Sequence, residues 1–133
     1  MESLAVKYLL DTHAVIWVLE NSPKLGNAAR LATPYAAIRD LAISDFTLLE
    51  IALLMKKGKL TTTVEPEEML QQIANLFTVL PVSAAIAWDA ASLSLPHGDP
   101  FDRVITATAR QHRLTLITKD EKITASQLVS VLW

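Results

Sequence analysis

Short apolar runs of strand length alternate with helix-like segments along the whole chain, and this alternation is the strongest constraint on the fold. The predicted strands cover residues 6–10, 41–44, 77–80, 114–118 and 128–132. The predicted helices cover residues 12–20, 26–37, 45–57, 65–75, 83–95, 100–113 and 121–126. Continuous apolar strands are typical of sheets buried on both faces, and strands separated by helices pair in parallel. The order of elements therefore predicts an α/β fold with a mainly parallel central sheet.

The composition limits the class of protein. With 133 residues, the chain is long enough for one domain with a sizeable core. Cysteine is absent, which excludes disulfides and thiolate zinc sites. Hydrophobic residues make up 51% of the chain, but no apolar run reaches the roughly 18 residues of a membrane span. No signal peptide is evident, so we expect a cytoplasmic protein without membrane association. The apolar excess instead favours a partner or homodimer interface.

The segment from residue 97 to residue 120 combines a helix start, an amphipathic helix and a strand. Asp99 takes the N-cap position, Pro100 the first helical position and Asp102 the third, which resembles a capping box. Capping and a functional role are both open for Asp99. Capping explains Asp102 less well, because a carboxylate there can also point into a cleft. Helical spacing predicts that the buried face of this helix contains Val104, Ile105, Thr108, Ala109 and His112.

Two further aspartates, Asp11 and Asp120, each follow directly after an apolar strand. Ligands of open parallel α/β sheets bind at the carboxyl ends of the strands. Asp11 can also cap the helix that begins at the next residue, which is the alternative to a functional role. The equivalent placement of the two aspartates after two strands favours a shared site.

Glu50 lies past the first turn of the predicted helix 45–57, so it is not a cap. Its neighbours in the sequence are mostly apolar, namely Leu48, Leu49, Ile51, Leu53 and Leu54. A carboxylate among such neighbours needs a partner or solvent. A surface-facing glutamate is the alternative to a functional one.

Lys56, Lys57 and Lys59 form a cationic cluster at the end of the same helix. The formal net charge of the chain is −2, so any nucleic-acid site has to be local. The commoner meaning of such a cluster is a solvated helix end that complements the helix dipole. An acidic cleft repels phosphates unless cations offset it, so these lysines and Arg103 are the candidates for contacts to a phosphate backbone.

Asp11, Glu50, Asp102 and Asp120 fit one cleft if the strands are parallel and adjacent. Like charges raise one another's pKa, so four close carboxylates call for a cation. All-oxygen ligands favour Mg²⁺ or Mn²⁺ over zinc, and such an ion can activate water against a phosphodiester. The histidines make no competing metal site, because His13, His97 and His112 show no paired spacing and each is interpreted as a surface or packing residue. Neither a glycine-rich phosphate loop nor a Ser/His/Asp signature is present.

Four segments together resemble one known family. These are LLDTHAVIW, SDFTLLEIA, DPFDRVITATA and ITKDEKI, each of which contains one of the acids. In their order and spacing they resemble the PIN-domain ribonucleases, and specifically the VapC-type toxins of bacterial and archaeal toxin–antitoxin pairs. The resemblance spans essentially the whole chain. It implies one PIN domain over residues 1–133, a three-layer α/β/α sandwich and a Mg²⁺-dependent endoribonuclease, with Mn²⁺ as a substitute.

The resemblance also assigns roles to residues. Asp11, Glu50 and Asp102 fall on the core acidic triad, and Asp120 falls on a fourth, more variable acid. Asp99 matches an additional aspartate of the motif, and the resemblance implies that it caps the helix or supports the triad from beside it. Thr12 and Thr118 stand beside the acids, as related residues often do in the family. The segment after Asp120 lacks an aromatic residue that many relatives carry.

The family further implies a partner. VapC-type toxins are inhibited by a small VapB-type antitoxin, whose C-terminal segment wraps the toxin and places a basic residue among the acids. Relatives commonly form dimers through helices, for which 45–57 and 83–95 are the candidates here. Two alternatives remain open from the sequence: a housekeeping RNA-processing nuclease, and a catalytically silent PIN domain that binds protein.

Overall fold

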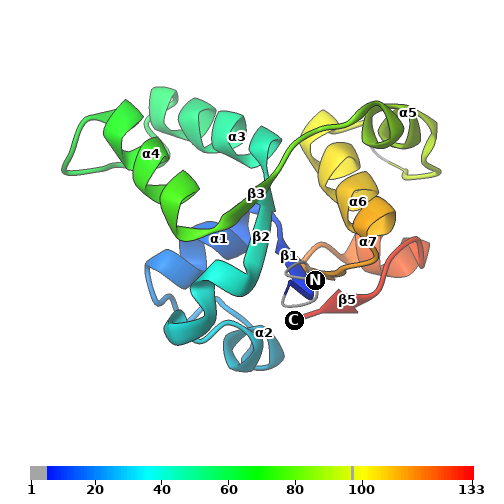
Figure 1. Ribbon diagram of the computed structural model, residues 1–133, viewed down its shortest axis with the longest axis horizontal. Helices are drawn as coiled ribbons and strands as arrows, with labels where there is room; N and C mark the ends of the chain where they lie inside the picture. The colour runs from blue at the N-terminus through cyan, green and yellow to red at the C-terminus, as the bar shows by residue number, and fades with distance from the viewer. Residues whose placement is uncertain (1–5, 97) are drawn as a thin grey trace.

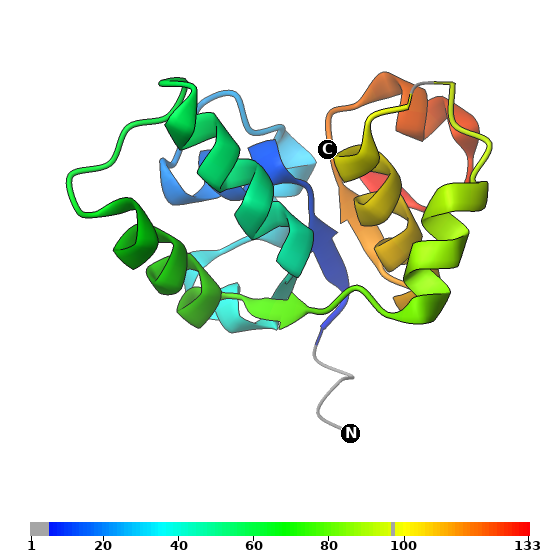
Figure 2. The same ribbon diagram turned by 90° about the horizontal axis from the view of Figure 1, so that it is seen from above.

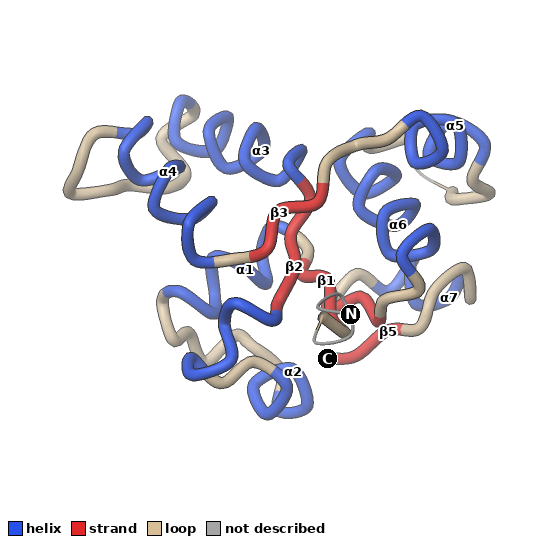
Figure 3. The backbone as a smooth tube through the Cα atoms, in the orientation of Figure 1, coloured by secondary structure: helices blue, strands red, loops and turns tan. Residues whose placement is uncertain are grey.

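The computed structural model describes residues 6–96 and 98–133, so His97 lies outside the described residues. The described residues form one parallel sheet of five strands in the order β3-β2-β1-β4-β5 (Figure 3). The strands are β1 (Tyr8–Leu10), β2 (Leu41–Ser44), β3 (Thr78–Leu80), β4 (Thr115–Ile117) and β5 (Val131–Leu132). The predicted parallel sheet is therefore confirmed.

Helices cover both faces of this sheet, which confirms the three-layer α/β/α arrangement (Figure 2). They are α1 (Thr12–Leu19), α2 (Asn27–Ala32), the 3-10 helix η2 (Tyr35–Asp40), α3 (Asp45–Lys56), α4 (Pro66–Leu76), α5 (Ala84–Ser92), α6 (Pro100–His112) and α7 (Glu121–Ser126). Helices α1 to α4 lie on one side of the strands and α5 to α7 on the other (Figure 1).

Adjacent residues of the central strands face the two different cores. Leu10 of β1 packs in a cluster with Val15 of α1 and Ile51 of α3. Leu9, its neighbour in β1, packs on the opposite face with Ile105 of α6 and Ile123 of α7. Successive side chains of a strand point to opposite faces of the sheet, so a continuous apolar strand contributes to the hydrophobic cores on both faces.

Two predicted helices are shorter or more divided than their sequences indicated. The segment 26–37 breaks at Thr33, because Pro34 has no N–H and keeps the residue before it out of the helical region. Tyr35 then begins the separate helix η2. The segment 83–95 ends as a helix at Ser92, since Leu93 is extended. His112, predicted on the buried face of α6, is exposed in its last turn.

Strand register brings two loops together at the carboxyl edge of the sheet. Leu10 of β1 pairs with Ile117 of β4, and the N–H of Asp11 donates to the carbonyl of Ile117 over 3.1 Å. The loop after β1 and the loop after β4 are therefore neighbours, which places Asp11 beside Thr118. In the described part of the chain, the helices are too short or too polar to cross a membrane.

Candidate active site

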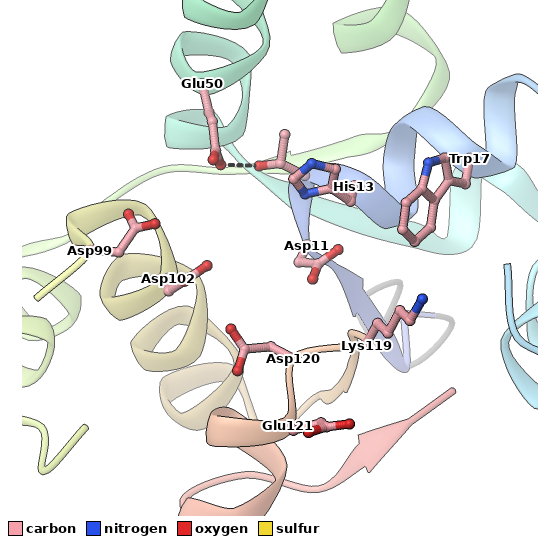
Figure 4. A pocket seen from close by; sticks show the side chains of 10 residues that line it. Asp11, His13, Trp17, Glu50, Asp99, Asp102, Lys119, Asp120 and Glu121 are labelled. Carbon is pink, nitrogen blue, oxygen red and sulfur yellow. Dashed lines mark hydrogen bonds between the residues drawn. The ribbon is translucent and has the colours of Figure 1, made fainter. Parts of the chain in front are cut away.

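A pocket of about 520 Å³ lies where β1 and β4 end (Figure 4). Its walls also include α1, α3, α6 and the start of α7. The lining residues are Asp11, Thr12, His13, Trp17, Glu50, Asp99, Asp102, Lys119, Asp120 and Glu121. All four predicted acids are therefore brought to one place by the fold.

Asp11 is held by hydrogen bonds to both of its carboxylate oxygens. Oδ1 accepts from the N–H of Ala14 over 2.8 Å, which makes Asp11 the N-cap of α1. Oδ2 accepts from the hydroxyl of Thr118. Burial raises the pKa of Asp11, and the hydrogen bonds from Thr118 and Ala14 oppose that rise because they stabilise the charged form. Capping and a place in the pocket are thus compatible in one side chain.

Glu50 reaches the pocket from the second turn of α3. Its Oε1 accepts a hydrogen bond from the hydroxyl of Thr12 (Figure 4). Burial raises the pKa of Glu50, and the bond from Thr12 opposes the rise. A glutamate that lines a pocket and accepts a buried hydroxyl is not the surface-facing residue of the alternative interpretation. Thr12 and Thr118 therefore lie against the acids, where they were predicted to lie.

Asp102 extends into the pocket from the first turn of α6 and lies near its other carboxylates. Burial, followed by repulsion from Asp99, Asp120, Glu50 and Asp11, raises its pKa to about 7. Asp99 caps α6 by accepting from the N–H of Phe101 over 2.9 Å, and it also lines the pocket. The pocket therefore concentrates more negative charge than its own residues neutralise.

Asp120 is the N-cap of the short helix α7. Its Oδ1 accepts from the N–H groups of Lys122 and Ile123 over 2.8 and 3.0 Å. Its own N–H donates to the hydroxyl oxygen of Thr118 over 3.1 Å. Since the same hydroxyl donates to Asp11, Thr118 ties the two strand ends and their acids together.

The chemistry of the donors fits a hydrated hard cation. Within the described residues, no three carboxylates or imidazoles stand close enough together to hold one ion directly. Mg²⁺ keeps several of its waters and is commonly held by one or two carboxylates, so the remaining acids can act through water. Burial and repulsion from the other carboxylates raise the pKa of Asp102, and a bound cation would offset that repulsion.

The predicted phosphate-binding cations lie elsewhere. The Nε and Nη2 atoms of Arg103 donate to the carbonyls of Ala90 and Leu93 over 2.8 and 2.7 Å, which ties α6 to the end of α5. Arg103 does not line the pocket. Lys56 is the last residue of α3, about 9 Å along the helix axis from Glu50 at 1.5 Å per residue. It is exposed and, like Lys57 and Lys59, does not line the pocket.

The pocket also contains residues that the sequence interpretation missed: His13, Trp17, Lys119 and Glu121. Lys119 and Glu121 flank Asp120 in the sequence and His13 lies two residues after Asp11, so proximity to a predicted acid was a usable signal for these three. His13, interpreted as a surface or packing histidine, adds an electrostatic effect that lowers the pKa values of Asp11 and Glu50. Trp17 lies one helical turn beyond His13 and shares its face of α1.

The comparisons with known proteins agree with this architecture. Residues 8–126 match the family model described as PIN domain. The chain therefore belongs to the PIN-domain family. Within that family it is similar to Ribonuclease VapC22 of Mycobacterium tuberculosis (strain ATCC 25618 / H37Rv), with 32% identity over 117 residues. The match covers 86% of this chain and 88% of VapC22, so the chain is a VapC-type member.

Solved structures repeat the fold. FitAcB from Neisseria gonorrhoeae superposes with a TM-score of 0.66 and 26% identity, over 95% of this chain and 96% of that one. A toxin–antitoxin complex from Klebsiella pneumoniae gives a TM-score of 0.66 at 24% identity, over 96% and 97% of the two chains. DNA-bound VapBC from Salmonella typhimurium gives a TM-score of 0.68 at 20% identity, over 96% of this chain and 97% of that one. The last two show a shared fold.

Proposed function

We propose that this chain is a metal-dependent endoribonuclease and the toxin of a VapBC-type toxin–antitoxin pair, formed by one PIN domain over residues 1–133. The observation that carries the proposal is the acidic pocket, to which four distant segments each bring a carboxylate. Gathering like charges costs stability, so a fold that does so at its ligand-binding edge favours a functional cause. Similarity to a protein named a ribonuclease supports the class of reaction.

In this proposal Asp11, Glu50 and Asp102 hold a hydrated Mg²⁺, for which Mn²⁺ can substitute, and Asp120 is the fourth acid. When bound, such an ion supplies a water of lowered pKa and offsets the charge that develops on a phosphodiester. The hydroxyls of Thr12 and Thr118 hold Glu50 and Asp11 in orientation. Asp99 supports the start of α6, from which Asp102 extends.

The antitoxin partner is supported by the neighbours that are described as toxin–antitoxin complexes. This chain offers a matching surface, an apolar groove of about 210 Å³ between α1, α3 and α4. Its apolar lining consists of Ile16, Leu19, Ile51, Met55, Leu60, Met69 and Ile73. An amphipathic helix of the antitoxin would pack into this groove, while an arginine or lysine beyond it would pair with the acids and compete with the metal.

We also propose that the chain forms a homodimer, through α3 or α5. Both helices expose large apolar side chains: Leu49 and Leu53 of α3, and Trp88 of α5, which is 76% exposed. Covering such side chains favours association. Light scattering at tens of micromolar should give twice the mass of the chain, and a strict monomer would contradict the proposal.

Expression in a bacterial host tests the toxin. The chain alone should arrest growth, and co-expression of the small reading frame expected immediately upstream of its gene should relieve the arrest. Asp11→Asn, which keeps the capping oxygen of Asp11 but removes its charge, should abolish toxicity at an equal protein level. Harmless expression of a folded, RNA-cutting protein without such a neighbour would instead identify a housekeeping nuclease.

Purified protein tests the chemistry directly. Single-stranded RNA should be cut in the presence of Mg²⁺ or Mn²⁺, and a chelator should stop the reaction reversibly. A folded protein that neither binds Mn²⁺ nor cuts RNA would be a silent PIN domain, and the proposal would be wrong.

A further inference from the structure

Trp17 lines the acidic pocket but takes no part in holding the acids. Its indole packs against the core on the α1 side of the sheet. The ring of His13 lies 5.6 Å from it at 48°, and the ring of Trp133 meets it edge-on at 5.7 Å and 61°. Packing and ring contacts therefore hold a large aromatic surface in a set position at the rim of the pocket.

Two lysines meet at this aromatic ring from distant parts of the chain. The ammonium groups of Lys24, in the turn after α1, and of Lys119, in the loop after β4, each lie 5.9 Å from the ring centroid of Trp17. Both lysines are exposed. Lys119 lines the pocket on the same side as Trp17 (Figure 4), and Lys24 brings a second positive charge to this ring.

An aromatic ring between two lysines has the chemistry of a binding site for single-stranded nucleic acid. Unpaired bases stack on aromatic side chains, and lysines follow the phosphate backbone. Cation–π contacts of exposed lysines are weak, so a lysine can leave the ring for a phosphate while a base takes its place. A fixed ring also loses little freedom when a base binds, which favours affinity.

We propose that Trp17, Lys24 and Lys119, here called the Trp17 subsite, bind the nucleotide next to the phosphodiester held at the acids. The base stacks on the indole of Trp17, and the two lysines hold its flanking phosphates. The inference rests on the proposed ribonuclease function and adds to it the recognition of an unpaired base. Single-stranded RNA should therefore be preferred over duplex RNA, whose bases are already stacked.

Cleavage kinetics test the stacking. Trp17→Leu should lower kcat/KM on a short fluorescein-labelled single-stranded RNA by about tenfold, as expected for loss of one base–aromatic stack. Trp17→Phe should retain part of the activity. The matched control is Tyr35→Leu, which removes an exposed aromatic side chain of η2 outside the pocket and should leave kcat/KM unchanged.

RNA with a single abasic nucleotide, moved through the sequence one position at a time, tests the contact from the other side. One position should lower kcat/KM for the wild type about as much as Trp17→Leu does. At that position, the losses of kcat/KM caused by the abasic RNA and by Trp17→Leu should not be additive, because each change removes the same base–indole stack. Additive effects would overturn the stacking.

The salt dependence of RNA binding tests the two lysines, which are exposed and can be replaced without disturbing the hydrophobic core. In a cleavage-silenced Glu50→Gln background, Lys24→Ala and Lys119→Ala should each reduce the slope of log Kd against log salt for the same RNA by about 0.7. Lys7→Ala is the control, because Lys7 precedes β1 at the opposite end of the strand and is exposed. Its slope should match that of the parent protein.

The outcomes separate this inference from the proposed function. A wild type that cuts RNA, with folded Trp17→Leu at unchanged kcat/KM, overturns the Trp17 subsite and leaves the nuclease standing. If Trp17→Leu does not fold, the abasic RNAs and the salt slopes of the lysine variants test the subsite instead. The subsite is overturned if wild-type kcat/KM is insensitive to every abasic position and the lysine variants keep the parent slope. The subsite is also overturned if Trp17→Leu lowers kcat/KM equally on duplex and single-stranded RNA. A wild type that neither cuts nor binds RNA overturns the proposed function itself.

Discussion

The two sides of the acidic pocket hold their carboxylates in different ways. On the β1 and α3 side, Asp11 and Glu50 each accept a hydrogen bond from a threonine hydroxyl. On the α6 side, Asp102 lies among other carboxylates, and repulsion from them adds to the burial that raises its pKa to about 7. Burial raises the pKa of all three carboxylates, but threonine hydrogen bonds oppose the rise for Asp11 and Glu50, whereas repulsion from four other carboxylates adds to it for Asp102.

This difference indicates a division of labour. Neutral hydroxyls can preorganise a carboxylate without adding charge, so the β1 and α3 side is set before any ligand arrives. The α6 side gains most from a cation, because a positive charge would remove the repulsion that Asp102 experiences. The following predictions test how much each part of the pocket contributes.

The largest effect should come from removing a carboxylate of the proposed metal site. Asp102→Asn, Asp11→Asn and Glu50→Gln keep the shape of each side chain, and each should lower RNA cleavage by on the order of 10³-fold or more, several kcal/mol of transition-state stabilisation. Asp40→Asn, at an exposed aspartate outside the pocket, is the control and should cut normally. Full cleavage by folded Asp102→Asn would remove this residue from the catalytic set.

A smaller loss is expected from the hydroxyl that links the two strand ends. Thr118→Val removes the hydrogen bond to Asp11 and the acceptor for the N–H of Asp120. Cleavage or metal affinity should fall by about 10- to 100-fold, as for other residues that orient metal ligands. Thr118→Ser keeps the hydroxyl and should restore most of the activity. Equal activity of the valine and serine variants would show that the hydroxyl does not matter.

Asp120→Asn should be milder than loss of any acid of the triad. An amide oxygen can still accept from the N–H groups of Lys122 and Ile123, so the cap on α7 persists. Cleavage assays at saturating and limiting Mn²⁺ should show the deficit mainly at limiting metal. A loss as large as that of Asp102→Asn would place Asp120 among the essential acids.

The metal-free protein should lose stability as the pH rises from about 4 toward 7. The folded-state pKa of Asp102, about 7, lies above its ordinary value of 3.8, so the folded state binds the proton more tightly in this range. The stabilisation is therefore complete below the ordinary pKa and is lost as the pH rises through 7. Thermal melts in a chelator should show Tm falling between pH 5 and pH 8.

Two companion measurements sharpen that result. Asp102→Asn should reduce the fall of Tm with pH, because one of the groups with a raised pKa is gone, while Asp40→Asn should reproduce the wild-type slope. Mn²⁺ at pH 8 should raise the Tm of the wild type, since a ligand that binds the folded state stabilises it. A Tm that rises between pH 5 and pH 8 without metal would contradict the electrostatic description of the α6 side.

The smallest effect is expected from the lysines at the end of α3. These lysines do not line the pocket, so they can contact only phosphates of the RNA that lie beyond the cleaved bond. Replacing Lys56, Lys57 and Lys59 by alanine should therefore weaken RNA binding only slightly. Each lysine that contacts a phosphate should contribute about 0.7 to the slope of log Kd against log salt. An unchanged slope would assign these lysines to a solvated helix end.

Local signals account for what could be predicted. The apolar runs 41–44 and 114–118 became β2 and β4 because β-rich apolar segments pair wherever they meet. The start of α6 was readable from Asp99 and Pro100, since capping involves neighbouring residues alone. The break before Tyr35 was also encoded locally, in Pro34, and was overlooked.

The sequence by itself determined the order of strands and helices and the placement of Asp11 and Asp120 at strand ends, because hydrophobic periodicity and capping act over a few residues. Only the tertiary structure decided which charges meet. Packing of α6 on α5 turned Arg103 toward the carbonyls of Ala90 and Leu93. Pairing of β1 with β4 brought Lys119 to Trp17, two residues that are 102 positions apart in the chain. Electrostatic and stacking interactions depend on distance through space, which strand register and helix packing set.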